Sequence, residues 1–326
     1  MSRSEMTVNG RTGGRRRGRR GRRESMVGEA EFSSYYGRPV VKEPTWAPLD
    51  IAGYLFLGGL AGASSALAAG AELSARPGLA RPLKLGAAGA ISLSLLALVH
   101  DLGRPARFLN MLRVFKPTSP MSVGVWILTA YAPAAGAAAL DELVPLGRLR
   151  PLGKLGTAGA ALLGPAVASY TAVLISDTAT PAWHEGHREM PFVFVGSAAS
   201  AAAGLGLLGA PLAENAPARR LAVIGALAEL AAVRLLERRV GIVAETYHRG
   251  RAGVLMRAAE ALSLLGVAGA IRGGHRSRLA AALSGAALLA ASACARFGIF
   301  EAGRASARDP KYTVKPQRER LRDEQP

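Results

Sequence analysis

The chain has 326 residues, of which half are hydrophobic and 20% are charged, and its formal net charge is +18. A mean hydropathy of +0.19 in so basic a chain indicates that apolar and charged residues are segregated along the sequence. The single cysteine, Cys294, excludes an internal disulfide framework, a CxxC zinc site, c-type haem attachment and an iron–sulfur cluster held by this chain.

The first 48 residues form a basic segment that contains 11 Lys/Arg and 5 Asp/Glu. Its centre, residues 15–23, consists only of arginine and glycine. Such low-complexity sequence cannot bury a core, so we expect a disordered tail. Contact with anionic lipid or RNA is one role for this tail, and a solvated segment that fixes membrane topology is the other. We predict the second role, with membrane lipid and not nucleic acid as the partner.

A series of long apolar segments follows Pro48. A helix needs about 20 consecutive apolar residues to span a bilayer. Gly-rich stretches within the segments, such as 58–62, favour close helix packing in lipid. The predicted spans are 49–72, 82–100, 121–140, 156–176, 191–212, 218–237, 253–272 and 279–301.

Eight apolar segments separated by short charged loops predict an all-α polytopic membrane protein. We expect eight transmembrane helices, arranged in two four-helix-bundle-like halves. The expected organisation is a basic disordered tail over 1–48, a transmembrane domain over 49–301 and a polar tail over 302–326. The last of these is too polar and too interrupted by proline to span a membrane or to pack alone.

The distribution of Lys/Arg predicts the orientation in the membrane. With eight spans both termini lie on one face, here named face A, together with the loops after the second, fourth and sixth spans. Face A carries 27 Lys/Arg and the opposite face, face B, carries 11. The positive-inside rule therefore makes face A cytoplasmic. We predict a multi-pass protein of the plasma membrane with both termini in the cytoplasm.

The positions of the histidines argue against a haem-carrying subunit. Four of the five belong to face A, namely His100, His184, His187 and His248. A b-type haem needs axial ligands within the bundle, and no two histidines lie at matched depth in the predicted spans. We therefore predict no haem and no metal site in this chain.

The loop after the second span holds the most informative motifs, in residues 100–108 and 115–122. Ser119 is placed to cap the third span, with a proline at the first helical position. Asp101 and Arg104 lie at the membrane face. They belong either to an anchoring loop with a local salt bridge or to a polar mouth with an ionisable carboxylate beside an amphiphilic ligand.

These motifs, together with three others, resemble the signature of the NrfD/polysulfide reductase membrane-subunit family. The resemblance covers about residues 27–318. The motifs are Phe32-Ser-Ser-Tyr-Tyr-Gly-Arg-Pro, Tyr54-Leu-Phe-Leu-Gly-Gly-Leu-Ala-Gly, Asp101-Leu-Gly-Arg-Pro-Ala-Arg-Phe, Lys116-Pro-Thr-Ser-Pro-Met-Ser and Asp309-Pro-Lys-Tyr-Thr-Val-Lys-Pro-Gln.

The resemblance implies a quinone-binding membrane anchor of a multisubunit oxidoreductase. Members of the family carry no redox metal and bind quinone, menaquinone or ubiquinone, near the face where a ferredoxin-like 4Fe–4S subunit docks. A molybdopterin catalytic subunit often completes the complex. By this resemblance the chain is not an enzyme alone, and its C-terminal tail is expected to lie along the iron–sulfur partner.

The resemblance also implies where the quinone head binds. A first-span polar pair falls on Asp50 and Tyr54, and a fourth-span tyrosine falls on Tyr170. The better-studied pattern has amide and imidazole side chains at the first-span positions, so this chain departs from it. We expect the head at face A, with a tyrosine donating to a quinone carbonyl. Asp101 would exchange protons with water, and Arg104 would keep it ionised.

Charged residues within the sixth and seventh spans leave two alternatives open. A membrane transporter is one, and a purely structural anchor without quinone chemistry is the other. Arg234 and Glu260 can reach similar depth on antiparallel spans, and their ion pair is the expected structural role. A proton path through Glu229 and Glu260 is the functional alternative.

Overall fold

The computed structural model describes residues 40–104, 106–144 and 150–323, and in these ranges the chain is helical and has no strands. The arginine–glycine run and the motif that begins at Phe32 lie outside the described residues. The long helices are α1 (Pro48–Leu73), α2 (Pro77–Asp101), α4 (Pro120–Leu143), α5 (Arg150–Ser176), α7 (Met190–Gly209), α8 (Ala216–Arg239), α10 (Gly250–Arg272) and α11 (Arg278–Arg308). The short ones are α3 (Ala106–Met111), α6 (Pro181–Glu185), η2 (Gly241–Ala244), α9 (Glu245–His248) and α12 (Lys311–Asp323).

Local signals set many of the helix ends. Proline occupies the first turn of most long helices, where a backbone N–H has no intrahelical partner. The predicted cap of α4 is confirmed, because Ser119 Oγ accepts from the N–H of Ser122 at 3.5 Å. α2 ends at Asp101, and Gly103 follows with a φ of +67°, a backbone conformation that glycine adopts without strain.

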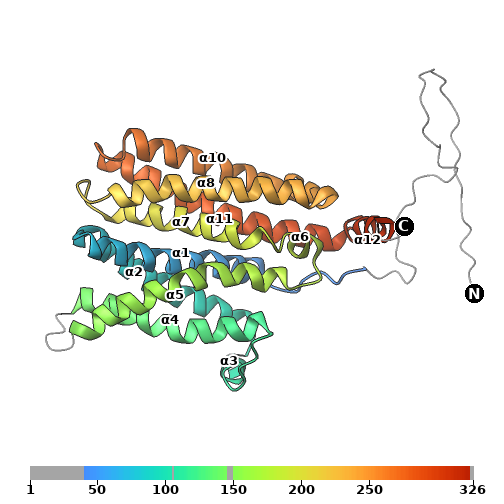
Figure 1. The fold of residues 1–326 in the computed structure, drawn as a ribbon, viewed down its shortest axis with the longest axis horizontal. Coiled ribbons are helices and arrows are strands. Elements are labelled where there is room, and N and C mark those ends of the chain that lie inside the picture. The colour runs from blue at the N-terminus through green and yellow to red at the C-terminus, as the bar shows by residue number, and fades with distance from the viewer. Residues whose placement is uncertain (1–39, 105, 145–149, 324–326) are drawn as a thin grey trace, which may run out of the picture.

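The long helices run alternately up and down and pack in two sets (Figure 1). α1, α2, α4 and α5 contact one another, and so do α7, α8, α10 and α11. The two sets meet mainly through α1, α5, α7 and α11. Figure 1 places α6 and α12 at the end where α1 begins and α11 ends, which is face A.

Glycine contacts allow the central helices to approach closely. A Cβ on Gly62 of α1 would overlap the backbone of Gly164 on α5, and the reverse also holds. A Cβ on Gly204 of α7 would lie 2.6 Å from the carbonyl oxygen of Gly285 on α11. Small residues at these positions therefore bring backbones together, as expected for helices that associate in lipid.

Seven of the eight long helices in the described part of the chain are long and apolar enough to cross a membrane. The chain is thus a multi-pass helical membrane protein by length and composition. The exception is α8, the predicted sixth span. It carries Arg219 and Arg220 near its start and Glu229 and Arg234 further along, so its apolar content falls below that of the other seven. Hydropathy therefore does not confirm the predicted count of eight.

The C-terminal segment, predicted as a polar tail over 302–326, is largely helical in the described residues. α11 continues to Arg308, beyond the predicted boundary at residue 301, because its sequence has no helix breaker before Pro310. α12 then folds back onto face A, where Tyr312 is only 6% exposed. Lys311 Nζ lies 3.4 Å from Glu245, and Arg320 Nη2 lies 3.0 Å from Glu185. Ion pairs with residues of the face A loops thus attach α12 to the bundle, although most of α12 is too polar to form part of the apolar core.

Two ion-pair clusters tie the ends of the helices together. At face A, Glu43 binds Arg304 at 2.9 Å and Arg308 at 2.7 Å, which joins the segment before α1 to the end of α11. At face B, Lys84 of α2 is 3% exposed and binds Glu72 of α1 and Glu142 of α4, the latter at 2.8 Å. Each cluster holds together helices that are distant in the sequence.

Replacing Lys84 should destabilise the fold. Lys84→Met leaves Glu72 and Glu142 side by side without a cation, and we expect a loss of about 2 kcal/mol in the free energy of unfolding. This loss is smaller than the ~3–5 kcal/mol expected when one partner of a fully buried ion pair is removed, because both carboxylates stay partly exposed. Thermal unfolding in detergent measures the change. A triple variant that also carries Glu72→Gln and Glu142→Gln should recover most of it, and unchanged stability of Lys84→Met would contradict the prediction.

The Glu43 cluster should respond to pH. Hydrogen bonding to the Arg308 guanidinium, with a further contribution from Arg304, lowers the pKa of the Glu43 carboxyl below its usual value. The stabilisation is therefore complete above the ordinary carboxyl pKa and is lost as the pH falls through the lowered value. Trp46, which stacks on Trp183 with centroids 6.0 Å apart, reports the loss by fluorescence. Glu43→Gln should remove this acid transition, and an identical titration in the variant would rule out the cluster as its origin.

Candidate functional site

Two of the residues predicted from the sequence meet in the interior near face A. Tyr54 of α1 is 2% exposed and Tyr170 of α5 is 8% exposed, and their hydroxyls share a hydrogen bond. Gly124 of α4 makes room for this arrangement, because a Cβ there would overlap the ring of Tyr170. The result is a pair of phenols, here called the tyrosine pair, enclosed by three helices.

Asp50 and Asp101 lie at the face A end of α1 and α2, and each has a partner that the sequence did not indicate. Asp50 Oδ2 lies 2.8 Å from Nδ1 of His100, a side chain that is 80% exposed. Asp101 Oδ1 accepts from the backbone N–H of Ala47 at 3.2 Å, immediately before α1. Asp101 therefore holds the start of α1, and His100 connects Asp50 to the surface.

The expected contact between Arg104 and Asp101 is absent from the described residues. Arg104 is exposed in the turn after α2, and the described residues include no ion pair between the two side chains. The left-handed conformation of Gly103 turns the chain away from the end of α2 before Arg104. No contact in the described residues supports the predicted role of Arg104, which is to keep Asp101 ionised.

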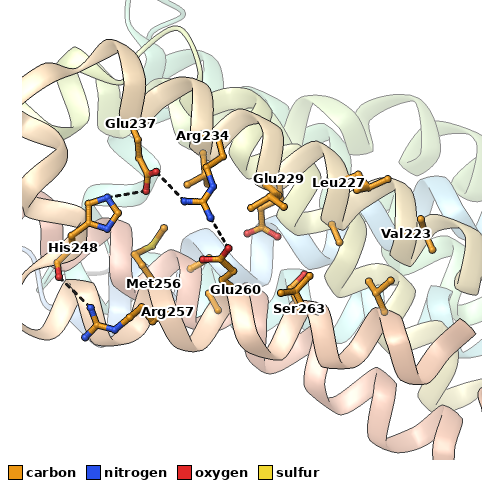
Figure 2. Close-up of a pocket in the computed structure, with 17 residues that line it drawn as sticks. Val223, Leu227, Glu229, Arg234, Glu237, His248, Met256, Arg257, Glu260 and Ser263 are labelled. Atoms are coloured by element: carbon orange, nitrogen blue, oxygen red, sulfur yellow. Dashed lines mark hydrogen bonds and ion pairs between the residues drawn. The ribbon is translucent and has the colours of Figure 1, made fainter. Parts of the chain in front are cut away.

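A cavity of ≈ 150 Å³ with a mostly apolar wall and one charged end lies between α8 and α10 (Figure 2). Its charged end is near face A. There Arg234 donates to Glu260 at 2.7 Å and to Glu237 at 3.4 Å, and His248 Nε2 lies 3.2 Å from Glu237. The ion pair between Arg234 and Glu260 is the one that the sequence predicted. Toward face B the cavity wall becomes apolar, as the positions of Val223 and Leu227 in Figure 2 show.

Two further charged residues lie at or next to the inner wall of this cavity. Glu229 faces the cavity and is 9% exposed. Ala295 of α11 also lines the cavity, and the next residue, Arg296, is fully buried. Arg296 Nη2 donates to the carbonyl of Phe194 at 2.6 Å, and its guanidinium lies 3.7 Å from the centre of the Phe194 ring.

Three of these residues are not indicated as site residues by the sequence. Arg296 is one charge within a predicted span, although an arginine in an apolar run of that length already requires a partner. A histidine at a helix end such as His100 is ordinarily solvated, and only the fold shows Asp50 beside it. Gly124 is one of many glycines in the spans, so no local signal distinguishes it.

The chemistry available in these residues is hydrogen bonding and proton transfer. Phenol hydroxyls donate and accept hydrogen bonds, and carboxylates and imidazole exchange protons with water. No group of three or more His, Cys, Asp or Glu side chains within the described ranges could hold a metal ion.

Comparison with known proteins agrees with this architecture. Residues 42–291, well over half of the chain, match the family of polysulphide reductase, NrfD. A search of curated proteins gave no match. The matched region begins just before α1 and ends within α11, so it includes the tyrosine pair and the cavity between α8 and α10. The chain belongs to the polysulphide reductase NrfD family.

Proposed function

We propose that the chain is the quinone-binding membrane anchor of a multisubunit oxidoreductase. In this role it would exchange electrons between a ferredoxin-like 4Fe–4S subunit and the membrane pool of menaquinone or ubiquinone, with a molybdopterin subunit as the catalytic partner. The family is generally linked to quinone-interacting anchors of oxidoreductase complexes. The observation that carries the proposal is the buried tyrosine pair near face A.

The tyrosine pair fits the head group of a quinone. A quinone presents two carbonyl acceptors on an apolar ring, and each phenol offers one donor. Within the pair one phenol donates to the other, so the accepting phenol keeps its own O–H for a quinone carbonyl. When bound, the quinone supplies the two-electron chemistry that the side chains lack. Tyr54 and Tyr170 bind and orient it, and neither needs to ionise.

The carboxylates at face A support a proton supply for the same site. His100 is exposed to solvent and contacts Asp50, four residues before Tyr54 on α1. A proton can therefore pass from water through His100 to Asp50 Oδ2. Asp101 lies beside this route at the start of α1 and remains part of the proposal as a second exchange site. Glu260 has a structural role in its pair with Arg234.

We also propose that all eight long helices cross the membrane, in two halves of four. α7 ends at face B and α10 begins at face A, so the chain between them must return across the bilayer, and α8 has the length to do so. One of its charges is compensated by α10, since Arg234 binds Glu260. Face A would then be the cytoplasmic side of the plasma membrane and the docking face for the iron–sulfur subunit.

The cavity between α8 and α10 favours one alternative, a membrane transporter. A charged cavity between two spans is typical of a solute path. Flux of a solute through the purified chain in liposomes, without partner subunits, would support that function. A purely structural anchor would support partner assembly but no quinone turnover.

Removing the hydroxyl of Tyr170 should weaken quinone binding. We expect Tyr170→Phe in the assembled complex to lower the affinity for a quinone-site inhibitor about tenfold, since the hydrogen bond contributes about 1–1.5 kcal/mol. The complex should remain assembled, with its iron–sulfur clusters reducible by substrate. Inhibitor titration of quinone reductase activity in membranes measures the effect.

Tyr131→Phe is the matched control for this variant. Tyr131 is also buried and shares a hydrogen bond of 2.7 Å with Ser65, away from the tyrosine pair. Its substitution should leave inhibitor affinity unchanged. If Tyr170→Phe and Asp101→Asn both retain full quinone reductase activity, the quinone site is elsewhere.

Reporter fusions test the orientation. A reporter that is active only outside the cytoplasm should be silent at the C-terminus and active in the loop between α4 and α5. This follows from the 27 Lys/Arg on face A against 11 on face B. The opposite pattern would put the redox partner outside the cell.

A further inference from the structure

The cavity between α8 and α10 has the polarity of an amphiphile. Its charged end lies near face A, and from there toward face B its wall consists mainly of aliphatic side chains (Figure 2). Arg257 and Val267 both line the cavity and are ten residues apart on α10, or about 15 Å along the helix axis at 1.5 Å per residue. This length is half the ~30 Å thickness of a bilayer core, which is the depth of one leaflet of acyl chains.

The cavity opens at the outer surface of the bundle. α10 packs mainly against α11 and contacts α8 less extensively. Leu227 of α8 and Leu264 of α10 line the cavity and are nevertheless exposed. Exposed aliphatic side chains of spanning helices face the acyl chains of lipids, because the bilayer core contains no water. An acyl chain therefore has access to the apolar part of the cavity.

The carboxylates that line the cavity are paired or lie deep in it. Arg234 donates to both Glu260 and Glu237. His248 Nε2 lies 3.2 Å from the same Glu237 carboxylate. Glu229 is ten residues before the end of α8, or about 15 Å from face A along the helix axis. None of these carboxylates neutralises a further cation at the mouth of the cavity.

Arg257 supplies such a cation. Its Nη1 donates to the carbonyl of His248 at 3.3 Å, which brings the guanidinium back along α10 toward face A. The side chain is exposed, and the described residues offer it no carboxylate. Nε and Nη2 therefore stay available, and this edge of a guanidinium binds a phosphate through two parallel hydrogen bonds.

The chain around the mouth adds positive charge. Residues 238–257 contain five arginines and one glutamate. Two of the arginines form ion pairs with carboxylates. The other three, Arg238, Arg251 and Arg257, are exposed and have no carboxylate partner in the part of the chain that the structure describes. Basic pockets between membrane spans bind the headgroups of anionic lipids, so this rim favours an anionic headgroup over a zwitterionic one.

We propose that the cavity between α8 and α10 binds one anionic glycerophospholipid from the face A leaflet. An acyl chain occupies the aliphatic part of the cavity, and the phosphate lies at the mouth against the guanidinium of Arg257. The lipid fills the space between two helices that contact each other little, and so joins them. The proposal rests on the proposed crossing of the membrane by α8 and not on quinone chemistry. The reporter fusions test that crossing separately, because without α8 the C-terminus and the loop between α4 and α5 would share one side.

Lipid titration tests the headgroup contact. The purified full chain in a neutral detergent is titrated with phosphatidylglycerol, or with phosphatidylcholine of the same acyl chains, and bound lipid is counted by native mass spectrometry. We expect phosphatidylglycerol to bind about fivefold more tightly, because an arginine at the membrane surface attracts an anionic lipid. Arg257→Gln should remove this preference, and Arg257→Lys should retain part of it.

Arg272→Gln is the matched control for the headgroup contact. Arg272 is an exposed arginine at the opposite end of α10, at face B. Its substitution should leave the preference for phosphatidylglycerol unchanged. Equal affinity of the unmodified chain for the two lipids would overturn the proposal. An equal loss in Arg272→Gln and Arg257→Gln would also overturn it, since the attraction would then be general.

A bulky side chain in the cavity tests the acyl-chain contact. Ser263 of α10 and Leu227 of α8 line the cavity from opposite sides. We expect Ser263→Trp and Leu227→Trp each to lower the affinity for phosphatidylglycerol about fivefold, although Arg257 is unchanged. Ser92→Trp is the control, at an exposed position within the span formed by α2. If both cavity variants bind phosphatidylglycerol as tightly as this control, the lipid lies outside the cavity and the proposal is wrong.

Discussion

The close approach of α1 and α5 is the contact on which the candidate site depends. Gly62 and Gly164 meet backbone to backbone, and a side chain on either one would hold the two helices apart. The tyrosine pair lies on the same two helices toward face A, so the glycine contact sets the distance across which Tyr54 and Tyr170 must meet. Close packing of small residues, which stabilises helices in lipid, also creates a buried pair of hydrogen-bond donors.

A second constraint acts on every charge within the apolar bundle. A charged group at membrane depth has to find a partner, water or the interface. Lys84 forms ion pairs with two carboxylates and Arg234 forms one with Glu260, so these charges link neighbouring helices. Arg296 is different, because the fold gives it one carbonyl and one aromatic face but leaves two nitrogens unmet. Arg296 is therefore the buried cation whose donors the described residues satisfy least completely.

Both polar regions open toward face A. The tyrosine pair lies below the contact between Asp50 and His100, and the cavity with Glu229 lies below Glu237 and His248. The Glu43 cluster and α12 gather on the same face, where they order the surface around these openings. The charged groups of both regions therefore gather at one face of the bundle.

The sequence by itself determined the helical membrane architecture, the family and the cap at Ser119, because length, hydropathy, proline position and motif are properties of contiguous residues. It also placed Arg234 and Glu260 at matching depth, since two antiparallel spans joined by a short loop have a known register. Only the tertiary structure decided that Tyr54 meets Tyr170, that Asp101 binds the N–H of Ala47 and not Arg104, that α12 packs on face A, and that Glu229 lines a cavity. These contacts depend on the rotation of each helix about its axis, which is set by the packing of many side chains far apart in the sequence.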